Sequence, residues 1–208
     1  MNVLVIAATE FEIEPFLRLN NTADVLIAGV GVPSTIYNLT KKLLHSNYDL
    51  VIQAGIAGSF TSTLQNGSVT FIEKDTFADI GVDEKGNFKT LFDMGFIKEN
   101  EFPFTSGWLE NQHAFLSKTS LALATGITVN KITDDINEIR SLSEKFNAGI
   151  ESMEGAALHY VCLQQKINFV QLRSISNSVG ERDKQKWAMK EAITNLNIEL
   201  KKLIDHFI

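Results

Sequence analysis

The chain has 208 residues, of which 44% are hydrophobic and 21% charged, as in folded globular proteins and unlike disordered or membrane-embedded ones. Its formal charge is −6 and its lysines and arginines are scattered among acids, so no nucleic-acid partner is expected. The single cysteine, Cys162, excludes an internal disulfide and a cysteine-based zinc site, which favours the reducing cytoplasm. No stretch approaches the ~20 apolar residues of a membrane span, and no basic residue precedes the first apolar run as in a signal peptide.

The first part of the sequence alternates short apolar runs with amphipathic stretches. Residues 3–8 form an apolar run rich in β-branched side chains, typical of a strand buried on both faces. A helical stretch follows from Glu10, and a strand (25–28), a helix (33–45) and another strand (50–54) come next. This alternation predicts an α/β sheet with right-handed crossover connections.

The rest of the chain is expected to add strands and helices around one long polar segment. Residues 79–111 are irregular but aromatic-rich, which fits either a lid, ligand wall or interface, or a surface loop held by its own aromatic cluster. Further strands are expected at 67–77, 120–126 and 169–175, and helices at 134–146, 153–165 and 184–207. No repeat or linker divides the sequence, so residues 1–208 are expected to form one domain.

Two glycine-rich corners and a glutamate cluster follow the early strands. The corners are Gly-Val-Gly at 29–31 and Gly-Ile-Ala-Gly at 55–58. Ligands of open α/β sheets bind at the carboxyl ends of strands, but each corner could equally be a tight turn, and neither matches a dinucleotide fingerprint or a P-loop. Glu10, Glu12 and Glu14 could favour a helix start through its dipole, or one of them could be a general base.

The segment from Glu151 to Asn177 carries an unusual set of polar residues. Glu154 opens a helix of small residues, so it either marks a packing contact or accepts hydrogen bonds from vicinal hydroxyls such as those of ribose. Asn177 ends an apolar strand, where it could begin a turn or present its amide to a ligand. Asp183 is expected to cap the terminal helix, and Arg182 to pair with it or to hold an anionic ligand group. The histidines lack metal-ligand spacing, so no metal or cofactor is expected.

Together these motifs resemble those of the purine nucleoside phosphorylase-like superfamily along almost the whole chain. The matching stretches are Ala-Ala-Thr-Glu-Phe-Glu at 7–12, the corners at 29–31 and 55–58, Glu-Ser-Met-Glu-Gly-Ala at 151–156 and Arg-Ser-Ile-Ser-Asn at 173–177. The resemblance implies a three-layer αβα fold around a mixed, mostly parallel twisted sheet. Its hydrolytic branch, which includes methylthioadenosine/S-adenosylhomocysteine nucleosidases and futalosine hydrolases, is most similar, and the motifs from 152 to Trp187 look most like those of the futalosine hydrolases.

The resemblance also implies roles for individual residues. Glu12 matches the acid that activates the attacking water, Glu154 the ligand of the ribose 2′ and 3′ hydroxyls, and Asn177 the residue that faces N7 of the purine. Asp183 is the other candidate for assisting the leaving base. Val129 lies near the position where adenosine-type nucleosidases place an aromatic residue against the base. The residues expected to bind substrate are Gly55, Ile56, Val129, Ser152, Met153, Glu154 and Arg182.

Asn177 narrows the expected substrate to a 6-oxopurine nucleoside. The adenine nucleosidases that the chain resembles carry aspartate at this position, whereas an asparagine amide can donate a hydrogen bond to O6 or N7. The predicted reaction is the release of hypoxanthine from futalosine, a step of menaquinone biosynthesis. An adenine-releasing methylthioadenosine/S-adenosylhomocysteine nucleosidase and a catalytically inactive nucleoside-binding protein are the alternatives.

Water is the expected nucleophile, because no arginine stands near 29–31 or Gly55 to hold the phosphate that phosphorylases use. The resemblance further implies a homodimer or a larger homo-oligomer. The expected partners are therefore a small purine nucleoside and other copies of the chain, with no membrane partner.

Overall fold

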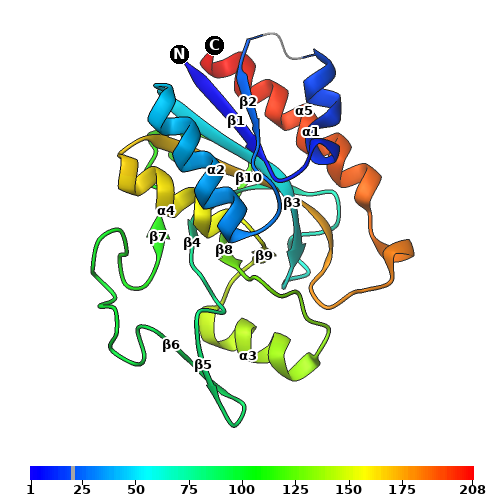
Figure 1. Ribbon diagram of the computed structural model, residues 1–208. Helices are drawn as coiled ribbons and strands as arrows, with labels where there is room; N and C mark the ends of the chain where they lie inside the picture. Colours follow the sequence, from blue (N-terminus) through cyan, green and yellow to red (C-terminus); the bar gives the residue numbers. More distant parts are fainter. Residues whose placement is uncertain (20–21) are drawn as a thin grey trace.

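The computed structural model describes residues 1–19 and 22–208, in which strands and helices alternate along most of the chain (Figure 1). The strands are β1 (Val3–Ala7), β2 (Asp24–Ile27), β3 (Leu50–Ser59), β4 (Val69–Asp75), β5 (Gly81–Glu84), β6 (Asn87–Thr90), β7 (Leu109–Glu110), β8 (Ala122–Thr128), β9 (Ile150–Ser152) and β10 (Asn168–Ser178). The helices are α1 (Glu10–Leu19), α2 (Val32–His45), α3 (Ile136–Phe146), α4 (Gly155–Gln165) and α5 (Met189–Phe207), with short 3-10 helices η1 (Ala114–Ser117) and η2 (Lys184–Lys186).

Eight of the described strands form one mixed sheet. Its order is β10-β4-β8-β9-β3-β1-β2, with β7 attached to β4 and an additional pairing between β10 and β3 that closes five strands into a ring. The pairings β1–β2, β1–β3, β3–β10, β4–β8 and β8–β9 are parallel. The pairings β4–β10, β3–β9 and β4–β7 are antiparallel. An α/β fold with a mixed sheet is thus confirmed, although five strands close into a ring in place of the single twisted central layer of the expected three-layer αβα fold.

Helices cover both faces of the sheet, which explains the continuous apolar character of its strands. In β1, Val3, Val5 and Ala7 pack in the cluster shared with α1 and α5. Leu4 and Ile6 pack in the other cluster, with α2 and α4. Figure 1 shows these two helix pairs on opposite sides of the strands, and α3 and the β5–β6 hairpin at the end of the molecule away from the termini. Burial on both faces is the reason that hydrophobic side chains do not alternate with polar ones in β1.

Two local expectations are wrong. The Gly-Ile-Ala-Gly stretch at 55–58 is not a turn but the second half of β3, because its backbone pairs with β10 on one side and, at Gly58, with β9 on the other. The terminal helix does not begin at 184 but at Met189. Trp187 Nε1 donates to the Glu181 carbonyl at 2.8 Å, and the Ala188 amide donates to the Ser176 carbonyl at 2.8 Å, and these bonds hold the preceding chain in a loop.

The polar segment at 79–111 contains more regular structure than expected, namely the β5–β6 hairpin and β7. Within it, the Phe92 and Phe104 rings meet edge to face with centroids 5.1 Å apart. In residues 1–19 and 22–208, no helix combines the length and the apolar character that crossing a bilayer requires.

Candidate active site

A cavity of about 270 Å³ lies at the carboxyl ends of β1, β3 and β10. This is the edge at which α/β sheets bind ligands. Seven of the ten predicted site residues line it, namely Glu12, Ile56, Ser152, Met153, Glu154, Asn177 and Arg182. Segments that are far apart in the sequence therefore converge on one cavity.

Both oxygens of the Glu12 carboxylate accept hydrogen bonds from the protein. Its Oε2 accepts hydrogen bonds from the backbone amide and the hydroxyl of Thr9, each at 3.0 Å, and its Oε1 accepts from the Ile56 amide at 3.1 Å. Burial raises the pKa of Glu12 above its usual range, and the nearby Glu154 adds to this rise, while Arg173 and the bond from Ile56 oppose it. An oriented carboxylate with a raised pKa is suited to accept a proton near neutral pH.

A break in α1 sets the position of Glu12. Ile13 has non-helical dihedral angles, and Pro15 lies inside the helix. In a regular helix the Phe16 amide would donate to the Glu12 carbonyl. Here Asn197 of α5 replaces that bond, since its Oδ1 accepts from the Phe16 amide at 3.0 Å and its Nδ2 donates to the Glu12 carbonyl at 2.9 Å. Asn197 thus fixes the backbone that carries the candidate base.

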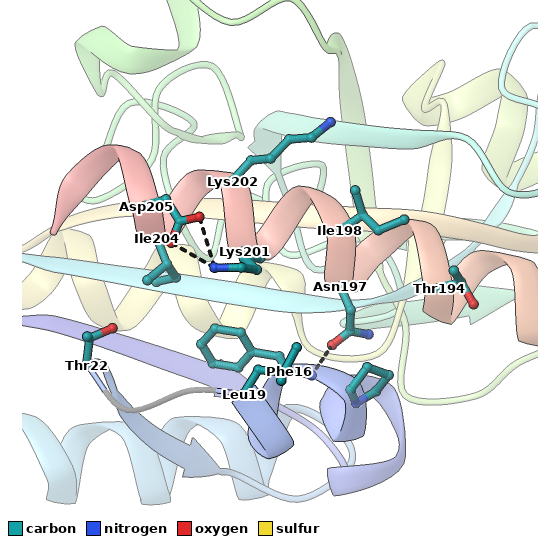
Figure 2. A pocket seen from close by; sticks show the side chains of 11 residues that line it. Phe16, Leu19, Thr22, Thr194, Asn197, Ile198, Lys201, Lys202, Ile204 and Asp205 are labelled. Atoms are coloured by element: carbon teal, nitrogen blue, oxygen red, sulfur yellow. Dashed lines mark hydrogen bonds and ion pairs between the residues drawn. The ribbon is translucent and has the colours of Figure 1, made fainter.

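Asn197 also lies in a second cavity, of about 480 Å³, between α1 and α5. Figure 2 shows this cavity, with the bond from the Phe16 amide to Asn197 and the ion pair between Lys201 and Asp205 along α5. Apolar side chains of both helices also line it, namely Pro15, Phe16, Leu19, Ile198 and Ile204. It lies on the α1 and α5 side of the fold and contains none of the predicted site residues, so we assign the chemistry to the first cavity.

Glu154 and Arg173 form a buried ion pair at the centre of the site. Glu154 Oε2 lies 3.6 Å from Arg173 Nη1, and the side chains are 7% and 1% exposed. Glu154 Oε1 accepts from the Gly31 amide at 2.9 Å, and Arg173 donates to the Gln53 Oε1 at 2.9 Å and to the Ile56 carbonyl at 3.3 Å. A side chain at Gly55 would collide with the guanidinium. Arg173 therefore compensates the charges of Glu154 and Glu12, two of the carboxylates that line the cavity.

A buried polar group supports the start of α4, from which Glu154 projects. Thr128 Oγ1 accepts from the Ala156 amide at 2.7 Å and donates to Asp75 Oδ1 at 2.9 Å. Asp75 and Gln171 lie so close to Gly155 that a methyl group there would collide with both. Complete burial raises the pKa of Asp75 to about 7, against the hydrogen bond from Thr128 and the charge of Arg173.

Asn177 lies near the end of β10 with its amide oriented by its neighbours. Ser176 Oγ donates to Asn177 Oδ1 at 2.7 Å, and Asn177 Nδ2 donates to the Ser178 carbonyl at 2.8 Å. The side-chain oxygen is therefore engaged, and the second hydrogen of Nδ2 is left to donate to a ligand.

Three predicted residues do not line the cavity. Gly55 lies behind Glu12, against the guanidinium of Arg173. Val129 is 1% exposed in a hydrophobic cluster, and its amide donates to the Ser152 carbonyl at 3.0 Å. Asp183 caps η2, not the terminal helix, because its Oδ1 accepts from the Gln185 amide at 3.0 Å. The proposed contacts of these residues with substrate stay predictions.

Arg173 and Trp187 are site residues to which the sequence analysis gave no role. An arginine in the middle of a predicted buried strand is a signal that could have identified Arg173, because a buried charge requires a partner. Trp187 closes one side of the cavity, and the Arg182 guanidinium lies 5.9 Å from its ring centre. Among the described residues, no cluster of histidine, cysteine or acidic side chains could hold a metal ion.

Comparison with known proteins shows the family to which the chain belongs. The family profile of the phosphorylase superfamily matches residues 18–208. A futalosine hydrolase of Streptomyces coelicolor is 30% identical over 192 residues, which cover 89% of this chain and 80% of that protein. One of Thermus thermophilus is 27% identical over 187 residues, covering 86% and 80%.

The fold is shared with solved structures of nucleosidases. The 5′-methylthioadenosine/S-adenosylhomocysteine nucleosidase of Neisseria meningitidis, in complex with methylthio-immucillin-A, superposes with a TM-score of 0.81 at 17% identity and covers 98% of both chains. Because the family profile matches residues 18–208, the chain belongs to the phosphorylase superfamily.

Proposed function

We propose that the protein hydrolyses the N-glycosidic bond of a 6-oxopurine nucleoside, with futalosine as the substrate and hypoxanthine as the released base. The observation that carries this proposal is the amide of Asn177 in the cavity, where an adenine nucleosidase is expected to carry a carboxylate. The sequence similarity to futalosine hydrolases over most of the chain supports the same substrate.

The orientation of Asn177 suits the hypoxanthine edge. O6 and N7 of a 6-oxopurine are both hydrogen-bond acceptors, and the free hydrogen of Nδ2 can donate to either. Negative charge develops on these atoms as the C1′–N9 bond breaks, so a fixed donor stabilises the departing base. We assign this role to Asn177 and not to Asp183, because the latter carboxylate caps η2 outside the cavity.

The proposed role of Glu154 is to bind the sugar, and that of Glu12 is to activate the attacking water. We propose that Glu154 accepts hydrogen bonds from the ribose 2′ and 3′ hydroxyls, because it lines the cavity and its charge is compensated by Arg173. Glu12 orients the attacking water and takes its proton, an assignment that its raised pKa supports. Arg173 is occupied by Glu154, Gln53 and the Ile56 carbonyl, which leaves it poorly placed to hold a phosphate dianion.

Product identification tests the proposal. The purified protein is incubated with futalosine, inosine and methylthioadenosine, with and without phosphate, and the free bases are separated by chromatography. We expect hypoxanthine from futalosine at a rate that phosphate does not change, and a loss of at least about 100-fold in the isosteric variant Glu12→Gln. Release of adenine from methylthioadenosine as the main activity would favour the rival nucleosidase. Binding without release of any base would favour an inactive binding protein.

We further propose that residues 1–208 act as one domain that assembles into a homodimer or a larger homo-oligomer in the cytoplasm. Exposed apolar side chains support self-association, among them Tyr37 and Leu44 on α2 and Phe96 and Phe102 in the 79–111 segment. The free, buried Cys162 is consistent with a reducing compartment. Light scattering coupled to size-exclusion chromatography measures the oligomeric state.

A further inference from the structure

One buried carboxylate in the cavity has no part in the mechanism above. Glu151 lines the cavity together with Asn177, yet it is only 4% exposed. Its Oε2 is buried without a hydrogen-bond partner, and none of the ion pairs found among the described residues includes it. An uncompensated carboxylate is costly to bury, so its presence beside a ligand cavity calls for a donor that the protein itself does not provide.

The sheet places Glu151 and Asn177 on the two sides of one slot. Gly58 of β3 pairs with Glu151 of β9 on one side and with Asn177 of β10 on the other. Residues directly opposite each other in neighbouring strands project from the same face, and two strand spacings separate these two by about 10 Å. A Cβ at Gly58 would lie 3.1 Å from Val179 Cγ2 and 3.6 Å from Asn177 Nδ2, and Gly58, Glu151 and Asn177 all line the cavity.

The chemistry of the slot matches the edge of a 6-oxopurine. We propose that Glu151 selects the base by accepting a hydrogen bond from N1–H of hypoxanthine, while Asn177 donates to O6 or N7 on the other side. Adenine has a lone pair at N1 in place of this hydrogen, so an ionised carboxylate repels it. This inference rests on the proposed function and adds to it a second, independent determinant of base choice.

The charges around Glu151 make the selection depend on pH. Burial raises its pKa to about 7, and Glu138 of α3 and Asp79 of the loop after β4 add to this rise, while Arg182 opposes it. The carboxylate is therefore mostly protonated at pH 6 and mostly ionised at pH 8. Because the ionised form is the stronger acceptor, affinity for hypoxanthine is expected to rise over this interval and affinity for adenine to fall.

Calorimetric binding of free bases tests the inference without requiring turnover. Hypoxanthine, adenine and 1-methylhypoxanthine, which lacks N1–H, are titrated at pH 6 and pH 8 into the wild-type protein, Glu151→Gln and the control Glu138→Gln. The control removes a neighbouring carboxylate that does not line the cavity. We expect wild type and control to bind hypoxanthine at least about tenfold more tightly than either other base at pH 8. In Glu151→Gln we expect this preference and its pH dependence to fall, leaving only the part of the discrimination against adenine that Asn177 provides.

The outcomes separate this inference from the proposed function. Retention of the full hypoxanthine preference in Glu151→Gln, or equal binding of hypoxanthine and 1-methylhypoxanthine to the wild type, would overturn the role of Glu151 even if futalosine is cleaved. A preference that depends on Glu151 in a protein that releases no hypoxanthine from futalosine would uphold the inference and refute the proposed function. The 1-methylhypoxanthine comparison needs no variant, so the result does not depend on the folding of Glu151→Gln.

Discussion

Replacement of Arg173 by methionine tests the electrostatic design of the site. Methionine keeps an unbranched side chain but removes the cation that lies 3.6 Å from Glu154 and opposes the raised pKa of Glu12. Breaking a buried ion pair by removing one partner costs about 3–5 kcal/mol, because the other charge stays buried without compensation. At about 2–4 °C per kcal/mol for a domain of this size, the melting temperature should fall by roughly 10 °C.

The double variant Arg173→Met/Glu154→Gln separates charge from packing. If the loss comes from the uncompensated Glu154 carboxylate, the second substitution should recover part of the stability, and a double-mutant cycle should give a coupling free energy above about 1 kcal/mol. The assay is thermal and urea unfolding of all four proteins at pH 7. A loss below about 1 kcal/mol in Arg173→Met, or a double variant no more stable than Arg173→Met, would refute this reasoning.

Three further substitutions have separable outcomes. Asn197→Ala leaves the Glu12 carbonyl and the Phe16 amide unpaired, so we expect a loss of about 2 kcal/mol and a shifted pH profile of kcat, whereas the control Asn195→Ala on the same helix should leave that profile unchanged. Burial raises the pKa of Asp75 from its ordinary 3.8 to about 7, so its ionisation destabilises the fold increasingly above pH 4 and fully above pH 7. Asp75→Asn should therefore raise the free energy of unfolding most at pH 8, by up to about 4 kcal/mol, with a matching rise in melting temperature. An equal gain at pH 5 and pH 8 would contradict this. Asn177→Asp should lower kcat/KM for futalosine at least about tenfold while sparing adenine nucleosides, as measured by base release.

The sequence allowed most elements of the fold to be predicted, because burial on both faces gives β1, β3 and β10 long apolar runs. It did not reveal β9, whose three residues Ile150–Ser152 are too short to show a periodic pattern. Nor did it reveal the closure of the sheet, which depends on pairings such as Gly58 with Glu151 between segments about 90 residues apart. Gly55 and Gly58 resemble turn residues in the sequence but lie in β3. A side chain at Gly55 would collide with Arg173, and one at Gly58 would contact Asn177.

The candidate site was predictable where short motifs carry the chemistry, as for Glu12, Glu154 and Asn177, which all line one cavity. Roles that arise from tertiary contacts were not predictable from the sequence. Asn197 acts through a broken helix turn 185 positions away along the chain, and nothing in its own helical stretch marks it as different from other polar residues. Glu151 adjoins a recognised motif, but only the sheet register places it opposite Asn177.

The most direct test of the central claim is the ratio of kcat/KM for futalosine to that for the otherwise identical nucleoside with a 6-amino group. The pair differs only at position 6 and N1 of the base, where Asn177 and Glu151 are proposed to act, so differences in the sugar or the 5′ substituent cannot affect the comparison. The account predicts a ratio of at least about 10 in favour of futalosine, with hypoxanthine as the released base. A ratio at or below 1, with adenine released at least as fast as hypoxanthine, would contradict it.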